Sequence, residues 1–535
     1  MLALLAVALA VLSPSARGLA AGLPPPRLGH TGPFLTDPSG RVVFLHGINA
    51  VWKRPPYVAP DTAAGFTAAD ADFLAANGIN AVRLGVLFAG VMPTQGVVDQ
   101  GYLAKIDRII QLLATRHIWV LLDFHQDAFN EKFKGEGFPA WAVHDDGIPF
   151  VDAGSFFANY QTPAVQRNYD HFWNNDFGLW DSYTQAWTAV ANKWARQPYL
   201  MGYDLFNEPS AGSQTPTCAN PAGCPAFDAT MQKLYDHVLA GIRTVDPNNM
   251  VWYEEQFFFN AISAGNFTHV ADPRIGLSWH DYACTPAFVS GGLIPGNPDC
   301  TVNEPRVMDN AAHQVAAMGA GSLLSEFGAG DDLQDLTRMT SIADQHLVGW
   351  MYWAYKLWND PTGSRFEGLY TDDSQPSSLK TAKVDVLVHP YPQAIAGVPT
   401  SLQWDPATKV MDLMFTPRRA TGLTDVFVPA RTYPAGYTTV VNGGTVRSAP
   451  GAAHVLVDAD AGASSVQVIV RPAGVPPSMT GPPAPAAGGP SGAGSGRELP
   501  ATGLRGAIPA AGAFAALAGL TLLALRRRHS LAHSK

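Results

Sequence analysis

The strongest constraint on the fold is a repeated alternation of short apolar runs with helical stretches between residues 41 and 355. Most runs are apolar except at their last residues, where polar groups appear, which is typical of parallel strands buried on both faces. The eight runs cover residues 41–49, 81–86, 119–125, 202–208, 250–255, 275–280, 322–328 and 349–355. Helical patterns cover residues 68–77, 102–116, 227–244 and 306–317. Eight β/α units predict an α/β protein built on a TIM (β/α)8 barrel.

The pattern changes after about residue 385. Residues 401–471 hold short segments of alternating apolar and polar residues separated by turn residues, which predicts a small C-terminal β-sandwich. We therefore expect the barrel over residues 24–390 and the sandwich over residues 391–472. The chain has 535 residues, of which 47% are hydrophobic. This is enough to give both parts a core without additional cross-links.

The N-terminus carries the pattern of an exported protein. Residues 2–12 form an apolar run of eleven, and small residues follow up to Ala21. We therefore interpret residues 1–21 as a signal peptide, although no basic residue precedes the run. A buried N-terminal helix is the alternative, which Pro14 and the prolines at 24–26 disfavour.

Residues 499–535 resemble the LPxTG cell-wall sorting signals of Gram-positive bacteria. The motif Leu499-Pro500-Ala501-Thr502-Gly503 precedes an apolar stretch at 507–525 and arginines at 526–528. The apolar stretch is roughly long enough to span a bilayer, and the arginines would stay inside. The resemblance implies that a sortase joins Thr502 to peptidoglycan, so that the protein is exported to the cell wall or surface, anchored or shed. An ordinary transmembrane anchor is the alternative.

The segment before this signal, residues 473–498, is rich in proline and glycine and has few large apolar side chains. Such a segment cannot bury a core, so we expect an extended stalk. A stalk of this kind would hold the folded part away from the wall, and a stalked surface protein is most simply a monomer.

Charge and cysteine content narrow the function classes. The net charge of −9 is opposite to that of most duplex-binding proteins, so we expect no nucleic acid partner. Four cysteines in an oxidising compartment predict two disulfides, and proximity in the sequence favours Cys218–Cys224 and Cys284–Cys300 among the three possible pairings. A zinc site is the alternative, but the CxxC spacing that it normally needs is absent.

A TIM barrel places its functional residues at the C-terminal ends of the strands. Two glutamates, Glu208 and Glu326, end the fourth and seventh runs. The other polar or aromatic residues at these ends are Arg83, His125, Gln126, Asp127, Asn207, Glu254, Glu255, His280, Tyr282 and Trp353. Glycoside hydrolysis requires one protonated and one ionised carboxyl group, and neighbouring His and Arg residues can hold the two in different states. A tryptophan supplies a face on which a sugar ring can stack.

These residues resemble those of family 5 glycoside hydrolases, which are retaining (β/α)8 enzymes with two glutamates. The motif Asn207-Glu208-Pro209 matches the NEP motif, and Ser325-Glu326-Phe327-Gly328 matches the strand that carries the nucleophile. The resemblance implies that Glu208 is the acid/base and Glu326 the nucleophile. It further implies substrate-binding or positioning roles for Arg83, His125, Asn207, His280, Tyr282 and Trp353. Glu254 and Glu255 form a second carboxylate pair that competes for a catalytic role.

Within the family, the chain is most similar to endoglycoceramidases, which cleave the bond between glycan and ceramide in glycosphingolipids. The motifs are HGINAVWKRPPY (46–57), DFHQDAFNEKF (123–133), FNEPSAG (206–212) and HPYPQAIAG (389–397). This resemblance implies that Lys53 and Asp127 bind hydroxyls of the first sugar. Ser210 stands where a tryptophan often follows NEP, which leaves glucosyl- or galactosyl-ceramide preference open.

Aromatic residues are frequent in the segments that follow the third and fifth runs. They are Phe124, Phe129, Phe133, Phe138, Trp141, Phe156, Phe157, Trp173, Trp180 and Phe257 to Phe259. They either line a groove for an amphiphilic substrate or pack the long insertions.

The alternative functions are an endo-β-glucanase or mannanase, and a non-catalytic glycan-binding surface protein. His125 with Asp127 could indicate a metal, but the spacing offers no third ligand, so we expect neither metal nor cofactor.

Overall fold

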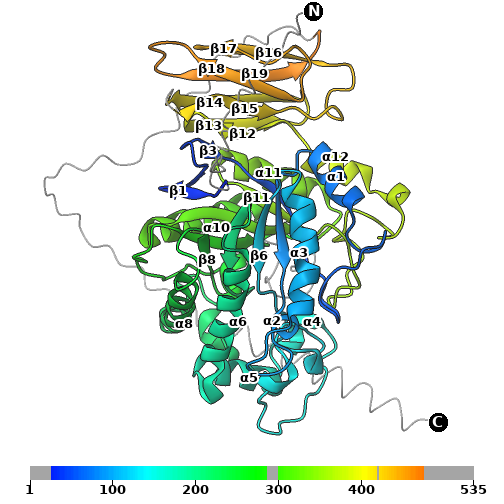
Figure 1. Cartoon of the computed structure of the whole chain (residues 1–535), viewed down its shortest axis with the longest axis vertical. Helices are drawn as coiled ribbons and strands as arrows, with labels where there is room; N and C mark the ends of the chain where they lie inside the picture. The colour runs from blue at the N-terminus through cyan, green and yellow to red at the C-terminus, as the bar shows by residue number, and fades with distance from the viewer. Residues whose placement is uncertain (1–25, 286–298, 419–420, 475–535) are drawn as a thin grey trace, which may run out of the picture. The chain divides into compact units, whose positions relative to one another are not determined.

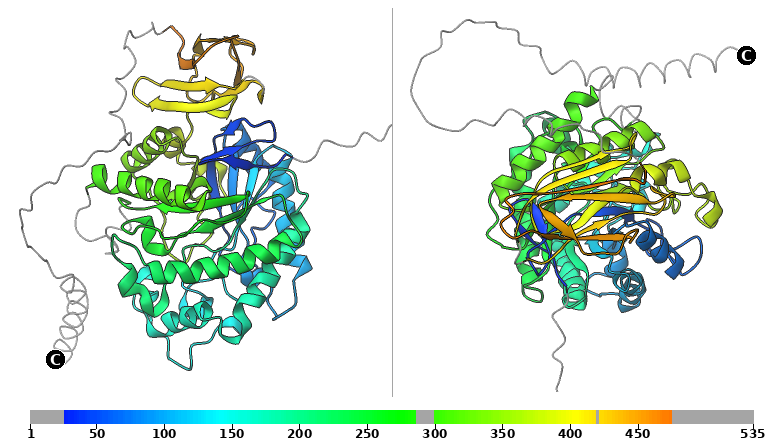
Figure 2. Two further views of the ribbon diagram at one scale, coloured as in Figure 1. Left: turned by 90° about the vertical axis from the view of Figure 1, so that its left-hand side faces the viewer. Right: turned by 90° about the horizontal axis from the view of Figure 1, so that it is seen from above.

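The computed structural model describes residues 26–285, 299–418 and 421–474. Eight parallel strands close into a barrel in the order β10-β11-β4-β5-β6-β7-β8-β9 (Figures 1 and 2). The strands are β4 (His46–Ala50), β5 (Ala81–Gly85), β6 (Trp119–Asp123), β7 (Leu200–Asp204), β8 (Met250–Glu254), β9 (Ile275–Asp281), β10 (Gly321–Gly328) and β11 (Trp350–Trp353). Each predicted run overlaps one of them, so the predicted barrel is confirmed.

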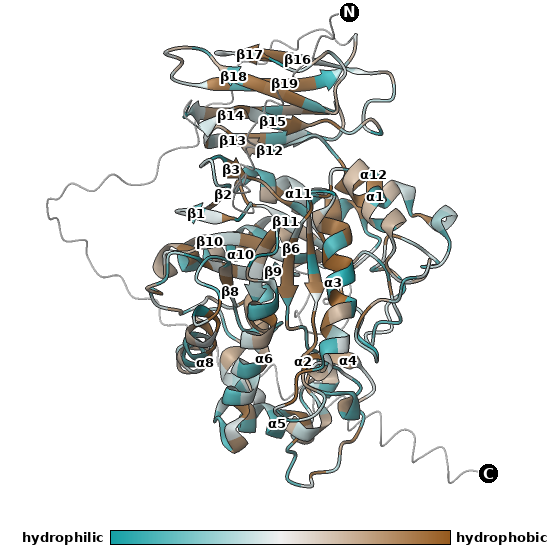
Figure 3. Ribbon diagram, viewed as in Figure 1, coloured by the Kyte–Doolittle hydropathy of each residue, from teal (hydrophilic) through white to brown (hydrophobic). Residues whose placement is uncertain are grey.

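Helices connect most of the successive strands. The longer ones are α1 (Ala68–Ala76), α3 (Gln100–Ala114), α5 (Pro163–Trp173), α6 (Leu179–Trp194), α8 (Pro225–Arg243), α10 (Cys300–Met318), α11 (Leu333–Gln345) and α12 (Thr381–Leu387). Helix α3 shows why they form. Asp99 caps its first turn by accepting from the Tyr102 backbone N–H, and Leu103, Ile106 and Ile110 are buried on one face. Figure 3 shows this helix with both polar and apolar residues beside the mainly apolar β6.

Short helical turns occupy the segments that leave the C-terminal ends of the strands. They are α2 (Phe88–Val91), η1 (Glu131–Phe133), η2 (Ala140–Ala142), α4 (Phe156–Asn159), η3 (Asp176–Gly178), η4 (Gly212–Gln214), α7 (Thr215–Cys218), η5 (Phe257–Asn260) and η6 (Pro376–Ser378). The connection from β8 to β9 contains only the 3-10 turn η5 in place of a full helix. This connection therefore runs close to the strand ends, where it can reach the site.

The barrel interior changes character along its axis. Near the N-terminal ends of the strands, Ala81, Leu121 and Met250 form an apolar cluster, which Leu28 and Leu35 cover. The next inward position on β5 is Arg83, whose side chain is fully buried among acidic residues. A charged layer thus lies on an apolar floor and supports the residues at the C-terminal ends.

The C-terminal part is a β-sandwich of two antiparallel sheets, as predicted. One sheet has the order β13 (Gly397–Asp405), β14 (Val410–Pro417), β19 (Val466–Pro472), β16 (Tyr437–Asn442). The other has the order β1 (Gly29–Thr31), β2 (Phe34–Thr36), β3 (Val42–Val43), β12 (Tyr391–Ile395), β15 (Thr424–Phe427), β18 (His454–Ala459), β17 (Gly444–Val446). Alternate residues of each sheet are buried between them, such as Leu413 of β14 in the first sheet and Val426 of β15 in the second.

The N-terminal strands β1 to β3 differ from the expected boundary. Residues 29–43 fall within the segment assigned to the barrel, yet Val42 and Val43 of β3 pair with Ile395 and Ala394 of β12. Strands of two or three residues carry too little periodicity to be recognised in the sequence.

Within the described part of the chain, none of the helices combines the length and apolarity that a membrane span needs. The expected signal peptide, the sorting signal with its apolar stretch and all of the expected stalk beyond residue 474 lie outside the described residues.

Candidate active site

A cavity of about 130 Å³ opens at the C-terminal ends of the barrel strands. The predicted site residues that line it are Lys53, His125, Asp127, Asn207, Glu208, Tyr282, Glu326 and Trp353. Arg83 and His280 contact the two glutamates. The structure therefore brings together every residue to which the family resemblance gave a catalytic or substrate-binding role.

Arg83 is the central cation of the site, and its side chain is fully buried. Its guanidinium donates to Glu326 Oε1 at 2.5 Å, to Asp204 Oδ2 at 2.8 Å and to Glu254 Oε2 at 3.0 Å. Asp123 Oδ1 lies 3.1 Å from the same group. One cation thus faces several acids, and burial raises the pKa of Asp204 to about 6 even though Arg83 opposes that shift.

Glu326 accepts hydrogen bonds that favour its ionised form. Arg83 donates to Oε1, and the Tyr282 hydroxyl donates to Oε2 at 2.9 Å. Burial raises the pKa of Glu326, while His280 and Arg83 oppose that rise. A carboxylate held by a guanidinium and a phenol is suited to act as a nucleophile.

Glu208 has a different environment. Burial raises its pKa to about 8, and nearby Asp127 adds to the effect, so the group is mainly protonated at neutral pH. Its backbone adopts a φ of 43°, in the left-handed region, and its backbone N–H donates to Glu254 Oε1 at 2.6 Å. Glu254, one of the two rivals for a catalytic role, therefore supports the turn that presents Glu208.

His280 lies between the two glutamates. Its Nδ1 is 2.9 Å from Glu208 Oε1 and 3.5 Å from Glu326 Oε2. Burial lowers the pKa of His280 to about 3, so the ring is neutral. One ligand atom from each of these three residues lies within 4.8 Å of the others, so a carboxylate oxygen of Glu208 lies within 4.8 Å of one from Glu326. The two carboxyl groups therefore approach each other closely in one site, as the pair of a retaining glycosidase must.

The family model for cellulase (glycosyl hydrolase family 5) matches residues 36–359, and a model for the glycoside hydrolase family 5 C-terminal domain matches residues 389–470. The chain belongs to glycosyl hydrolase family 5. The two matched ranges contain most of the barrel and of the sandwich. The geometry above is thus that of a family 5 glycosidase.

Several similar proteins carry related names. The chain is 32% identical to Endoglycoceramidase I of Rhodococcus hoagii over 453 residues, covering 82% of this chain and 87% of that protein. It is 29% identical to Endoglycoceramidase of Cyanea nozakii, covering 71% and 79%. The solved structure of Endo-glycoceramidase II from Rhodococcus sp. with ganglioside GM3 has a TM-score of 0.70 and 28% identity, covering 83% of this chain and all of that one.

Lys53 lies at the side of this family 5 site, where it contacts acids from separate loops. Its Nζ is 2.5 Å from Asp127 Oδ2 and 2.9 Å from Asp360 Oδ2. The ammonium also lies 4.5 Å from the centre of the Trp353 ring, and the His125 ring stacks on Trp353 with the ring centres 5.2 Å apart. Burial opposes the charge on Lys53, but the surrounding acids raise its pKa, so the ammonium is retained.

The sequence offered no third partner for His125 and Asp127, but the structure supplies Glu136. The ligand atoms of these three residues lie within 4.8 Å of one another. Asp127 and Glu136 exchange backbone hydrogen bonds, and a Cβ at Gly135 would lie 1.8 Å from Asp127 O, so the tight turn between them needs glycine. The Lys53 ammonium already provides a positive charge beside these acids, at 2.5 Å from Asp127 and 3.8 Å from Glu136.

Sequence reasoning missed several residues of the site. Asn260 of η5 donates to Glu208 Oε1 at 2.7 Å, and Glu367 accepts from Trp353 Nε1 at 3.2 Å. Asp360 and Glu367 follow the last barrel strand within an irregular segment, where no periodic pattern marks them. Glu255, the other rival carboxylate, is fully buried beside Asp228 and does not line the cavity.

The aromatic residues divide between the two expected uses. Phe124, Phe129, Phe133, Phe138, Trp173 and Phe259 are buried in the core. Phe156 and Phe157 line the main cavity, and Phe157, Phe257 and Phe258 line a small hollow beside it. Phe257 and Phe157 lie 6.5 Å apart, centre to centre. Only this second group borders the site.

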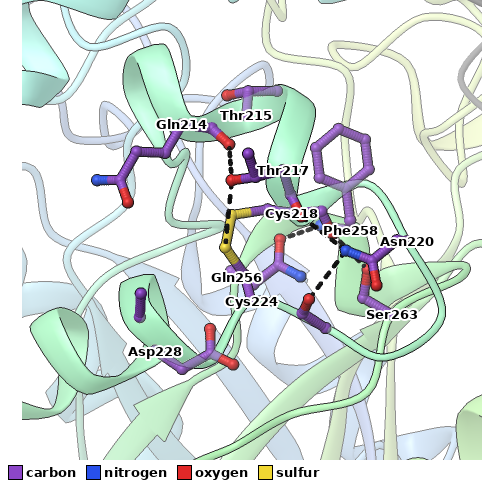
Figure 4. The surroundings of a disulfide bond; sticks show 12 residues. Gln214, Thr215, Thr217, Cys218, Asn220, Cys224, Asp228, Gln256, Phe258 and Ser263 are labelled. Atoms are coloured by element: carbon purple, nitrogen blue, oxygen red, sulfur yellow. Dashed lines mark hydrogen bonds between the residues drawn. A yellow bond between two sulfur atoms is a disulfide. The ribbon is translucent and has the colours of Figure 1, made fainter. Parts of the chain in front are cut away.

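Both predicted disulfides, Cys218–Cys224 and Cys284–Cys300, are formed, so no free cysteine is left for a zinc site. Figure 4 shows Cys218–Cys224 near Gln256 and Phe258. Ser263 Oγ donates to the Cys218 carbonyl at 2.9 Å, which ties the segment after β7 to the connection after β8. The first disulfide therefore closes a short loop within the segment after β7, and the Ser263 hydrogen bond joins that loop to the connection after β8.

Proposed function

We propose that this family 5 enzyme is a retaining endoglycoceramidase, which releases an oligosaccharide or galactose from the ceramide of a glycosphingolipid. The observation that carries the proposal is the pair of carboxyl groups with oxygens within 4.8 Å and with different hydrogen-bond donors. Glu326 meets Arg83 and Tyr282, whereas the raised pKa of Glu208 keeps that residue protonated. The names of its relatives supply the substrate class.

In the first step, an ionised oxygen of Glu326 attacks the anomeric carbon from the face opposite the leaving group. The bond between the anomeric carbon and the ceramide oxygen breaks, and its electron pair takes the proton of Glu208. Ceramide leaves as a neutral alcohol, and the glycan is held as an ester of Glu326. Glu208 is then ionised.

In the second step, Glu208 acts as a base. It takes a proton from a water molecule as the water oxygen bonds to the anomeric carbon, and the ester bond to Glu326 breaks. The glycan leaves with its anomeric configuration retained, Glu326 is again a carboxylate and Glu208 is again protonated. Lys53, Asp127, Asn207 and His125 line the cavity where sugar hydroxyls would bind, and Trp353 provides a ring face.

Aromatic side chains beside the cavity support an amphiphilic substrate. Phe157 borders both the main cavity and the hollow that Phe257 and Phe258 line. An apolar hollow next to the acid/base would suit the lipid part of the leaving group. The loops around the cavity also expose large apolar side chains, with Val151 at 72% and Phe366 at 60% exposure.

Product analysis tests the substrate class. The purified protein is incubated with lactosylceramide, with galactosylceramide and with soluble β-glucan or mannan, and the products are separated by thin-layer chromatography. We expect intact ceramide together with lactose or galactose, and the substrate that reacts gives the head-group preference. Shortened polysaccharides with untouched lipids would instead indicate a glucanase or mannanase. Binding without turnover of any substrate would indicate a glycan-binding protein.

Azide distinguishes the roles of the two glutamates. Replacing either with Gln should abolish turnover while the fold is kept. In Glu326→Gly, azide can take the place of the nucleophile and give an α-glycosyl azide from a substrate with a good leaving group. In Glu208→Ala, azide attacks the glycosyl ester and gives a β-glycosyl azide. The opposite assignment of the two products would contradict the proposed roles.

Export and wall attachment form a second part of the proposal. We propose that residues 1–21 are removed on export, that sortase joins Thr502 to peptidoglycan, and that the enzyme acts as a monomer on its stalk. The apolar run at 2–12 and the LPATG motif at 499–503 support this. Mass spectrometry of wall fragments released by muramidase should find a C-terminal peptide ending at Thr502 and joined to cross-bridge residues. A peptide that continues past Gly503 would exclude sorting.

A further inference from the structure

Asn260 links the two halves of the site although it belongs to neither glutamate's strand. It is the last residue of η5, in the connection between β8 and β9, and is 3% exposed. Its side-chain N–H donates to Glu208 Oε1 at 2.7 Å. Its backbone carbonyl accepts from the Tyr282 N–H at 2.8 Å, and the Tyr282 hydroxyl in turn donates to Glu326.

The contacts of the Glu208 carboxyl are unequal. Among the described residues, Asn260 Nδ2 and His280 Nδ1 both approach Oε1, at 2.7 and 2.9 Å. An oxygen that accepts from an amide N–H cannot easily carry the acid proton in the same direction. Because Oε1 accepts from the Asn260 N–H, and from His280 in the tautomer that carries its proton on Nδ1, the proton of Glu208 is directed to Oε2.

We propose that Asn260 is a positioning residue for acid catalysis, which fixes Oε1 of Glu208 as an acceptor so that the proton on Oε2 faces the leaving-group oxygen. This proposal rests on the assignment of Glu208 as the acid/base. The residue acts through Glu208 and through the position of Tyr282, and it need not touch the substrate.

The surroundings of η5 hold Asn260 in place. Gln256 caps the turn by accepting from the Phe258 backbone N–H at 2.9 Å, and Phe259 is buried in the core. The Phe257 N–H donates to the Pro209 carbonyl at 3.0 Å, so the turn is also tied to the residue that follows Glu208. A rigid turn that contacts the NEP segment twice can set the carboxyl orientation within narrow limits.

Leaving-group dependence tests this role. Kinetics are compared for phenyl β-lactoside, whose leaving group needs a proton, and 2,4-dinitrophenyl β-lactoside, whose leaving group does not. In Asn260→Ala we expect kcat/KM to fall by about tenfold or more for the phenyl substrate and by less than about threefold for the activated one. Asn260→Asp has nearly the same size and cannot donate when ionised, so it should show the same selectivity if the alanine variant folds poorly.

The pH profile gives an independent readout. The Asn260 N–H favours the ionised form of Glu208, so its loss should move the alkaline limb of kcat/KM to higher pH. The same titration can be followed without turnover, from the carboxyl stretch in infrared difference spectra against Glu208→Gln. An equal loss for both lactosides, or unchanged kinetics and titration, would overturn the proposal.

Asn266 provides a matched control. It lies in the same connection and donates to the buried Asp228 carboxyl at 2.8 Å, outside the cavity. Asn266→Ala therefore removes a similar hydrogen bond, and any effect should be equal for both substrates.

If the wild-type enzyme hydrolyses the lactosides but not glycosphingolipids, the proposed substrate class fails while the role of Asn260 is still measured. If the infrared titration of Glu208 is the same in Asn260→Asp as in the wild-type enzyme, that role is excluded even without turnover.

Discussion

Replacing Arg83 by methionine should destabilise the fold strongly at neutral pH. The variant keeps the length of the side chain but removes a guanidinium that contacts four carboxyl groups, those of Asp123, Asp204, Glu254 and Glu326. All four are at most 5% exposed at the side chain. Breaking a buried ion pair by removing one partner costs about 3–5 kcal/mol, because the other charge stays buried and unpaired.

The pH dependence separates this reasoning from a simple packing defect. Without Arg83, the carboxyl groups of the folded variant have still higher pKa values than in the wild type, where that of Asp204 is already raised to about 6. The folded variant then binds more protons than the unfolded chain at pH 5–7, so its stability falls as pH rises. The deficit against wild type should be largest at pH 7 and above and should shrink towards pH 5.

Urea unfolding at pH 5 and pH 7 measures both effects, with the free energy of unfolding taken from midpoint and slope. Arg167→Met is the control, because Arg167 pairs with Asp146 and both side chains are exposed, at 38% and 46%. Solvent screening should keep its loss well below that of Arg83→Met. A deficit for Arg83→Met below about 1 kcal/mol at pH 7, or one that does not shrink at pH 5, would refute the reasoning.

The remaining predictions concern pH and the glutamates. The alkaline limb of kcat/KM on a neutral aryl lactoside should lie near pH 8, because Glu208, whose pKa is about 8, must be protonated to act as the acid; a limb centred below pH 6 would contradict this assignment. Glu326→Gln should lose activity to the same extent on activated and unactivated substrates. Stopped-flow assays that compare the two kinds of leaving group would check this prediction. Burial lowers the pKa of His389 to about 4. In the unfolded chain, His389 binds a proton more readily than in the folded protein below about pH 6.5. The free energy of unfolding should therefore fall by up to about 3 kcal/mol between pH 6.5 and pH 4. Urea titrations of His389→Phe should lack this part of the pH dependence.

The position of the site could be predicted because a parallel barrel converts sequence position into spatial position. The last residues of eight separate runs meet at one end of the barrel, so Arg83, Glu208 and Glu326 can be grouped although more than 100 residues separate them in sequence. The disulfides were predictable for a similar reason, since short separations in sequence restrict the possible pairings. In each case a simple geometric rule connects the sequence to the structure.

The residues that were missed obey no such rule. Asn260 lies in a four-residue 3-10 turn, and Glu136 reaches Asp127 only because the turn at Gly135 brings the backbone of the two together. Asp360 and Glu367 come from an irregular segment after β11. Their placement depends on tertiary contacts such as the 2.9 Å approach of Asp360 to Lys53, which neither periodicity nor spacing encodes.

The different states of the two glutamates follow from the donors that each one meets rather than from their burial. Both side chains are less than 10% exposed, so desolvation raises the pKa of both. Glu326 meets the Arg83 guanidinium and a phenol, and Glu208 meets an amide and a neutral imidazole. Because charged donors stabilise a carboxylate more than neutral donors do, ionisation is favoured at Glu326. The barrel fixes this difference, because Arg83 is held on β5 with its guanidinium in contact with Glu326.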